Sequence, residues 1–295
     1  MTGTIIVGYD GTSFSAEAVH WAAEEATVRR APLRLVSCFG VPYTGVAVSA
    51  FPATGAAAAS MAGVEATLSA MSDVLRDSFP LLTCMTEALA APAWSALVDE
   101  AGPDDLVVVG AAAHGGSAAF WLGTTPGHLI RHADCPVAVI GGPATRGGPD
   151  RVVVAIDGSS SAAAALVWAV DEADLHHVPL LAVHGWYGSE LELSTAEEQE
   201  RDLTEIDAAC ILEEALRVAR ARCGMEVTGR LMERAPVTAV LDSVQDGDLL
   251  VLGSRGRGAV MSSVLGSTVM GVLDHAMVPV VVVRGHDLGG PLRTP

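Results

Sequence analysis

The stretch Ile5–Ala26, IIVGYDGTSFSAEAVHWAAEEA, returns at Val152–Ala173 as VVVAIDGSSSAAAALVWAVDEA. Each copy opens with a short apolar run and passes through Asp-Gly and a hydroxyl residue into an alanine-rich segment, so that Asp10 matches Asp157. A buried strand, a tight turn and a capped helix give this pattern. The chain therefore contains two copies of a strand–turn–helix unit.

A second pair of matching stretches closes each copy. Leu122–Ile140 reads LGTTPGHLIRHADCPVAVI, and Leu265–Val283 reads LGSTVMGVLDHAMVPVVVV. The segment between the copies, GGPATRGGPD, is rich in Gly and Pro, which is typical of a linker. The sequence thus predicts a first domain at residues 1–142, a linker at 143–150, a second domain at 151–285 and a tail at 286–295.

Apolar segments alternate with helical patterns in both copies, which is typical of a parallel sheet covered by helices on both faces. The expected strands are 4–8, 33–37, 82–89, 106–110 and 137–140 in the first copy, and 151–156, 180–184, 225–232, 249–252 and 279–283 in the second. Four helices are expected in the second copy. The first is capped by Ser160 or Ser161 and runs to about residue 176, the second covers 195–222, a short third begins at Pro236, and the fourth covers 267–276.

Ligands of such sheets bind outside the carboxyl ends of the strands, where the strand order reverses. Asp157 directly follows the first strand of the second copy, and Gly253 follows the fourth. If these strands are neighbours, both residues share one crevice. Asp10 and Gly110 would do the same in the first copy.

The composition argues against several classes of function. The 295 residues include 35 acidic and 17 basic ones, a net charge of -18, which argues against a nucleic-acid or anionic-membrane surface. All 17 basic residues are Arg, which removes every mechanism that needs a lysine. The five cysteines form no Cys-x-x-Cys pair and indicate reduced thiols. With no leader pattern and no membrane-length apolar run, we expect a cytoplasmic protein without a membrane span.

A glycine-rich stretch follows the fourth strand of the second copy. It reads GSRGRGAVMSSVLGST, and its first two glycines, Gly253 and Gly256, are three residues apart. Nine residues then precede Gly266 and Ser267. Four glycines, two arginines and several hydroxyl residues before an apolar helical pattern indicate a loop that lets a negative ligand approach the main chain.

These motifs resemble the universal stress protein family in its tandem two-domain form. Its ATP-binding members carry G-x2-G-x9-G-[ST], which Gly253, Gly256, Gly266 and Ser267 fit, and the Asp-Gly-[Ser/Thr] after the first strand also matches. The resemblance implies two Rossmann-like α/β sandwiches of the adenine nucleotide alpha hydrolase type. Each would hold a five-stranded parallel sheet of order 3-2-1-4-5 with helices on both faces.

The resemblance also implies a binding role for residues of the second copy. Asp157 would accept from the ribose hydroxyls, Ile156 would lie against the nucleoside, and the main chain of Gly185 would read adenine. The glycine loop and the start of the last helix would hold the phosphates with uncovered N–H groups. The expected residues of this part are Gly253, Arg255, Gly256, Arg257, Gly266, Ser267, Thr268 and Val269.

The first copy departs from the motif. Ala113 stands where the second glycine should be, Pro126 stands where the second copy has Val269, and Ala112 and His114 replace the two arginines. One backbone donor and much positive charge are thereby lost, and we expect ATP to bind weakly here or not at all. The candidate residues of this site are Tyr9, Asp10, Cys38, Gly110, Ala113, Gly123, Thr124 and Thr125.

Three functions fit these observations. The first is an ATP-binding stress or dormancy regulator without an efficient enzymatic step, which would bind ATP with or without Mg²⁺. The second is a slow ATPase, and the third is an interaction protein that has lost ATP. We expect no catalytic and no metal-ligating residues, since the recurring His132 and His275 are interpreted as lacking ligand-spaced partners. The Val-rich fifth strands are sheet edges that invite pairing, and the resemblance implies that they join the two halves of the chain. A homodimer is also expected.

Overall fold

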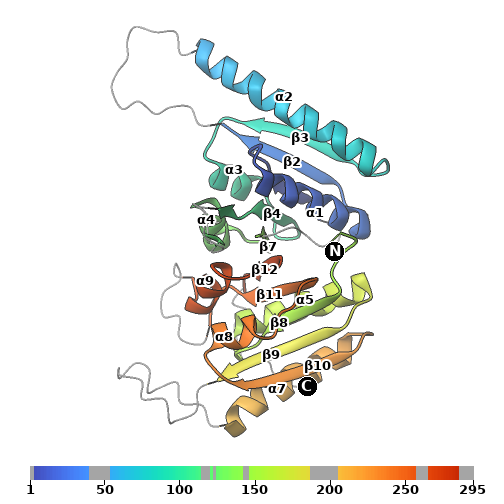
Figure 1. Ribbon diagram of the computed structural model, residues 1–295, viewed down its shortest axis with the longest axis vertical. Coiled ribbons are helices and arrows are strands. Elements are labelled where there is room, and N and C mark those ends of the chain that lie inside the picture. Colours follow the sequence, from blue (N-terminus) through green and yellow to red (C-terminus); the bar gives the residue numbers. More distant parts are fainter. Residues whose placement is uncertain are drawn as a thin grey trace, which may run out of the picture. The chain divides into compact units, whose positions relative to one another are not determined.

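The computed structural model describes residues 3–39, 54–113, 120–121, 124–141, 146–186, 205–256 and 265–285. The chain divides into two compact units, Met1–Gly115 with Leu122–Gly147 and Gly148–Pro295 with Gly116–Trp121, and Figure 1 labels the elements of both. Each unit is an α/β domain with a parallel sheet, as the repeat predicts. The helices of the described segments include none long and apolar enough to cross a membrane.

The sheet of the first unit has the order β3-β2-β1-β4-β7, which is the expected order 3-2-1-4-5. Every pair in it is parallel, with Val7 facing Leu35 on one side and Val108 on the other. The strands are β1 (Ile5–Gly8), β2 (Leu33–Cys38), β3 (Cys84–Leu89), β4 (Leu106–Gly110) and β7 (Val137–Ile140). The short β5 (Ala112–Ala113) and β6 (Phe120–Trp121) lie between β4 and β7 in sequence and are not part of this sheet.

The second unit repeats this order as β10-β9-β8-β11-β12, again with parallel pairs. Its strands are β8 (Arg151–Ala155), β9 (Leu180–Trp186), β10 (Val227–Glu233), β11 (Asp248–Gly253) and β12 (Val280–Val283). The predicted strands match these within two residues at every end. The expected strand order is confirmed in both units.

Helices cover both faces of each sheet. Ile5, Ile6 and Val7 are all buried, and because consecutive strand residues point to opposite faces, both faces must be covered. The helices are α1 (Ser13–Arg29), α2 (Thr54–Ser78), α3 (Ala93–Glu100) and α4 (Thr124–His132) in the first unit, and α5 (Ser160–His176), α7 (Glu205–Arg222), α8 (Pro236–Leu241) and α9 (Ser267–Leu273) in the second.

One predicted helix end differs from the structure, and one predicted helix start lies outside the described residues. The helix expected over 195–222 is described only as Glu205–Arg222, since residues 187–204 lie outside the described segments. The helix expected over 267–276 ends at Leu273, where Asp274 is the C-cap residue. His275 and Ala276 each donate to the carbonyl of Val272 and complete the turn that follows.

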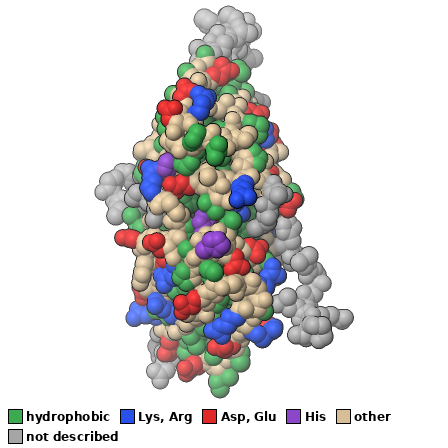
Figure 2. Space-filling model, turned by 90° about the vertical axis from the view of Figure 1, so that its right-hand side faces the viewer, with side chains coloured by type: hydrophobic (Ala, Val, Ile, Leu, Met, Phe, Trp, Pro, Cys, Tyr) green, Lys and Arg blue, Asp and Glu red, His purple; other side chains and the backbone are tan. Residues whose placement is uncertain are grey.

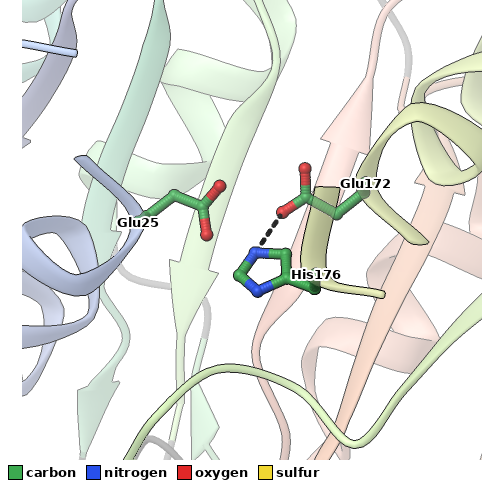
Figure 3. A group of neighbouring side chains, drawn as sticks. All are labelled: Glu25, Glu172 and His176. Carbon is green, nitrogen blue, oxygen red and sulfur yellow. Dashed lines mark ion pairs between the residues drawn. The ribbon is translucent and has the colours of Figure 1, made fainter. Parts of the chain in front are cut away.

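The first helix of each unit carries a buried carboxylate with a basic residue one turn later. On α1, Arg29 Nε lies 2.5 Å from Glu25 Oε1. On α5, His176 Nε2 lies 3.3 Å from Glu172 Oε1, and Figure 3 shows this pair. Such pairing compensates the burial of a charge. On the face of the molecule that Figure 2 shows, acidic and basic side chains are interspersed.

Candidate functional site

The strands that carry the second unit's motifs are neighbours. β8 pairs with β11, with Val154 facing Val251, so both strands end at the same edge of the sheet. Asp157 follows β8 by two residues, and Gly253 is the last residue of β11. The sheet therefore brings the aspartate and the glycine loop to one place, as the sequence predicts.

Direct contacts join the two loops. A Cβ added at Gly256 would lie 2.8 Å from Oδ2 of Asp157. The hydroxyl of Ser159 donates to the carbonyl of Arg255 at 3.2 Å. The half-buried carboxylate of Asp157 thus faces bare main chain, and a side chain at position 256 would compete with it for space.

The start of α5 holds Asp157 in this position. Ser159 is the N-cap residue, and its side chain accepts from the amide of Ala162 at 3.1 Å. Asp157 Oδ1 accepts from the amide of Ser159 at 2.9 Å. Gly158 has a φ of 78°, a left-handed conformation that explains the glycine between them. The Asp-Gly-Ser motif is therefore first a helix start, and it leaves Oδ2 of Asp157 on the side of the glycine loop.

The two outer glycines of the loop have different roles. A Cβ at Gly253 would lie 2.6 Å from the carbonyl carbon of Ser161 and 2.7 Å from the amide nitrogen of Ala162. Close packing of β11 against the first turn of α5 thus requires Gly253, with or without a ligand. Gly266 instead closes the loop, since its amide donates to the carbonyl of Ser254 at 3.2 Å.

The last helix begins beside Gly256. Gly266 is the N-cap residue of α9, and a Cβ there would lie 3.6 Å from the amide nitrogen of Gly256. Ser267, Thr268 and Val269 form the first turn of α9. Their amides precede the first bond of the helix, which Met270 donates to Gly266 at 3.2 Å. Arg257 lies outside the described residues.

The remaining candidates of the second unit are placed by β9. Ile156 is buried, and its amide donates to the carbonyl of Val183 at 2.8 Å. Gly185 was expected just after the second strand but lies within β9, opposite Met232. A Cβ at Gly185 would lie 2.7 Å from Cβ of Ala239, so the packing of α8 accounts for this glycine.

The sequence interpretation missed His184. This buried residue of β9 places Nδ1 2.6 Å from the carbonyl oxygen of Ile156. A carbonyl only accepts, so Nδ1 carries the proton and donates. The sequence signal was a single polar residue inside an apolar strand, and its partner could not be identified before the register of β8 and β9 was known.

The first unit holds its aspartate differently. Asp10 Oδ1 accepts from the Ser15 hydroxyl at 2.6 Å, the Thr12 hydroxyl at 2.6 Å and the Thr12 amide at 3.0 Å. Burial raises the pKa of Asp10, but these hydrogen bonds, led by that from Ser15, outweigh it and hold the pKa below its usual value. Ser15 corresponds to Ala162, which has no hydroxyl.

Other candidates of the first unit lie along its own sheet edge. Tyr9 donates its amide to Val36, and Cys38 ends β2, where burial raises the pKa of its thiol. A Cβ at Gly110 would lie 2.7 Å from the carbonyl of Phe14, so this glycine matches Gly253 in role. Ala113 ends β5, Thr124 and Thr125 begin α4, and Gly123 lies outside the described residues.

A doubly wound sheet with an aspartate after its first strand and a glycine loop after its fourth defines a class of α/β binding domains. The sequence pattern of the universal stress protein family matches residues 1–141 and 149–284. The chain belongs to this family, in its tandem form.

Individual relatives agree with this assignment. A universal stress protein of Mycobacterium tuberculosis is 31% identical over 299 residues, covering 95% of this chain and 96% of the relative. A universal stress protein of Mycolicibacterium smegmatis is 31% identical over 294 residues with the same coverage. The crystal structure of a universal stress protein from Archaeoglobus fulgidus has a TM-score of 0.67 at 18% identity, covering 96% of this chain and 98% of that chain. The structural likeness shows the fold.

Proposed function

We propose that the second unit binds ATP, with or without Mg²⁺, at the edge where β8 and β11 end. The observation that carries this proposal is the approach of the Asp157 carboxylate to the bare main chain of Gly256, 2.8 Å from the position of an added Cβ. A carboxylate suits ribose hydroxyls, and uncovered backbone amides suit phosphate oxygens. One crevice thus offers an acceptor and a set of donors to the two ends of one ligand.

The roles follow from this placement. Asp157 accepts from the ribose, and Ile156 and Gly185 lie on the side of the nucleoside. Gly256 and the first turn of α9 from Ser267 to Val269 face the phosphates, and Arg255 and Arg257 add positive charge. Packing against α5 already requires Gly253, so a substitution there tests the fold and not a contact with the phosphates.

We further propose that ATP occupancy, and not efficient hydrolysis, is the function of the site. The chain has no lysine, so the lysine that many phosphoryl-transfer enzymes place on the phosphates is missing. A cytoplasmic stress or dormancy regulator that responds to ATP fits such a site. A slow ATPase and a nucleotide-free interaction protein are the alternatives, and a homodimer remains part of the proposal.

Mass spectrometry of nucleotide released by denaturing the purified chain tests the proposal. One ATP per chain supports binding by a single unit, two support binding by both, and none after refilling with ATP and Mg²⁺ favours the interaction protein. Steady-state release of ADP at about 1 s⁻¹ or faster would instead favour the enzyme.

Gly256→Val is the informative variant for the site itself. The nearest atom to its added Cβ is the free end of the Asp157 side chain, which can move, so the fold should tolerate the change. ATP should bind more weakly because the valine covers the main chain. Unchanged affinity by calorimetry, in a variant with wild-type melting, would contradict the site.

A further inference from the structure

Two histidines lie one helical turn apart on α4 of the first unit. The ring centroids of His128 and His132 are 6.1 Å apart, and the rings are nearly parallel, at 15°. The interpretation that His132 has no ligand-spaced partner is therefore wrong, because His128 precedes it by four residues on the same helix. Residues four apart share one helix face, and a His pair at this spacing is the arrangement that helical zinc sites use.

Trp94 of α3 fixes the orientation of both rings. Its ring stacks on His128 at 5.0 Å and 24°, and contacts His132 at 5.7 Å and 39°. An aromatic neighbour that contacts both imidazoles restricts their rotation. The two rings are thus held on one side of the helix before any ligand arrives, which lowers the entropic cost of binding one.

His128 also carries an unsatisfied atom. Its Nδ1 is buried and has no hydrogen-bond partner among the described residues. A buried polar atom without a partner costs free energy, and such atoms often mark a missing ligand or ion. The lone pair on an unprotonated ring nitrogen is what a metal ion requires.

We propose that His128 and His132 bind a divalent transition-metal ion that prefers imidazole ligands, with Cu²⁺ favoured over Ni²⁺ and Zn²⁺ by the usual order of affinities. His132 is the last residue of α4, where the partial negative charge of the helix end favours a cation. Arg131 lies in the same turn and opposes a cation, so two-ligand binding of modest affinity is expected.

The second unit shows what this place looks like without the site. Val237, Gly271 and His275 correspond to Trp94, His128 and His132. A Cβ at Gly271 would lie 2.9 Å from Val237 Cγ2, so the smaller pair fills the space between α8 and α9. His275 Nδ1 lies 2.9 Å from the carbonyl of Gly271 and is thus already satisfied. The fold therefore does not need the imidazole and indole of the first unit.

Equilibrium dialysis of the full chain with Ni²⁺ tests the proposal, because Ni²⁺ does not oxidise the five thiols. His128→Asn and His132→Asn should each weaken binding of one ion per chain by about tenfold or more. His275→Asn is the matched control and should leave that ion in place. Equal Ni²⁺ binding in all four proteins would overturn the proposal, as would equal loss in the control.

A second variant guards against a folding defect. The double substitution Trp94→Val and His128→Gly copies the residues that the second unit tolerates at the same place. It should melt close to the wild type and still lose the ion. A Trp94→Phe variant isolates the optical signal, since Ni²⁺ should quench wild-type fluorescence more than the fluorescence of this variant. Ni²⁺ retained by a folded double variant would assign the histidines to packing alone.

Discussion

The two units treat the aspartate after their first strand differently, although both carry Asp-Gly and a hydroxyl residue. Three donors from Thr12 and Ser15 saturate Oδ1 of Asp10, and all three belong to the start of α1. Among the described residues, Asp157 receives one bond, from the Ser159 amide, and the Ser159 hydroxyl donates to the carbonyl of Arg255 instead. The same motif therefore stabilises a helix start in one unit and joins two loops in the other.

This difference teaches that the motif alone does not define the site. Ser15 against Ala162 decides how many donors surround the carboxylate, and Ala113 against Gly256 decides whether bare main chain follows the fourth strand. Both differences favour ligand binding by the second unit. The second unit has the more available carboxylate and a glycine in place of Ala113, so we predict that it is the tighter ATP site.

The largest expected effect separates packing from binding. Gly253→Val should destabilise the second unit by about 3 kcal/mol, because the added carbon would lie 2.6 Å from backbone of α5 and overpacking strains both elements. Gly110→Val should do the same to the first unit, where the distance is 2.7 Å. Denaturant unfolding measures both. Wild-type stability in either variant would mean that the helix moves freely and that the packing argument is wrong.

The next effect tests which unit binds ATP more tightly. Asp157→Ala removes a charged acceptor of ribose, which is worth roughly 1.5–3 kcal/mol, or about tenfold or more in affinity. The matched Asp10→Ala should leave the high-affinity site intact. Calorimetric titration of both variants measures this. Equal losses, or a larger loss in Asp10→Ala, would break the proposed asymmetry.

The sequence was sufficient for the fold because the pattern that predicts it is local and appears twice. The Val-rich strands and the capped helices that follow Asp10 and Asp157 each need only neighbouring residues. The reason for Gly253 could not be found this way, because its contact with Ser161 joins elements about ninety residues apart. The hydrogen bond from Ser159 to the carbonyl of Arg255 could not be predicted for the same reason. His128 was a different failure, since its spacing from His132 was visible in the sequence.

The pH dependence of the first unit should report the bonds to Asp10. Its pKa is lowered in the folded state, so this group adds stability above its unfolded pKa of about 4 and loses it as the pH falls through the folded pKa. Comparing the unfolding free energies of the wild type and Asp10→Asn at falling pH measures the contribution. The difference between them should shrink below about pH 4. A constant difference would show that the carboxylate charge is not what the bonds stabilise.

The smallest expected effect is a reciprocal exchange at the residue that distinguishes the two aspartates. Ser15→Ala removes one of the three bonds to Asp10 Oδ1, together with the bond from the Asp10 amide to the Ser15 hydroxyl, and should cost about 1 kcal/mol of unfolding free energy. It should also raise the pKa of Asp10 toward its usual value, because the Ser15 hydroxyl is the largest of the lowering contributions. Ala162→Ser introduces the corresponding hydroxyl into the second unit, five residues after Asp157. The first unit already carries a serine at the matching position, Ser15. If Ser15→Ala left both the stability and the titration of Asp10 unchanged, the contrast between the two aspartates would have to rest on Thr12 and Ser159 alone.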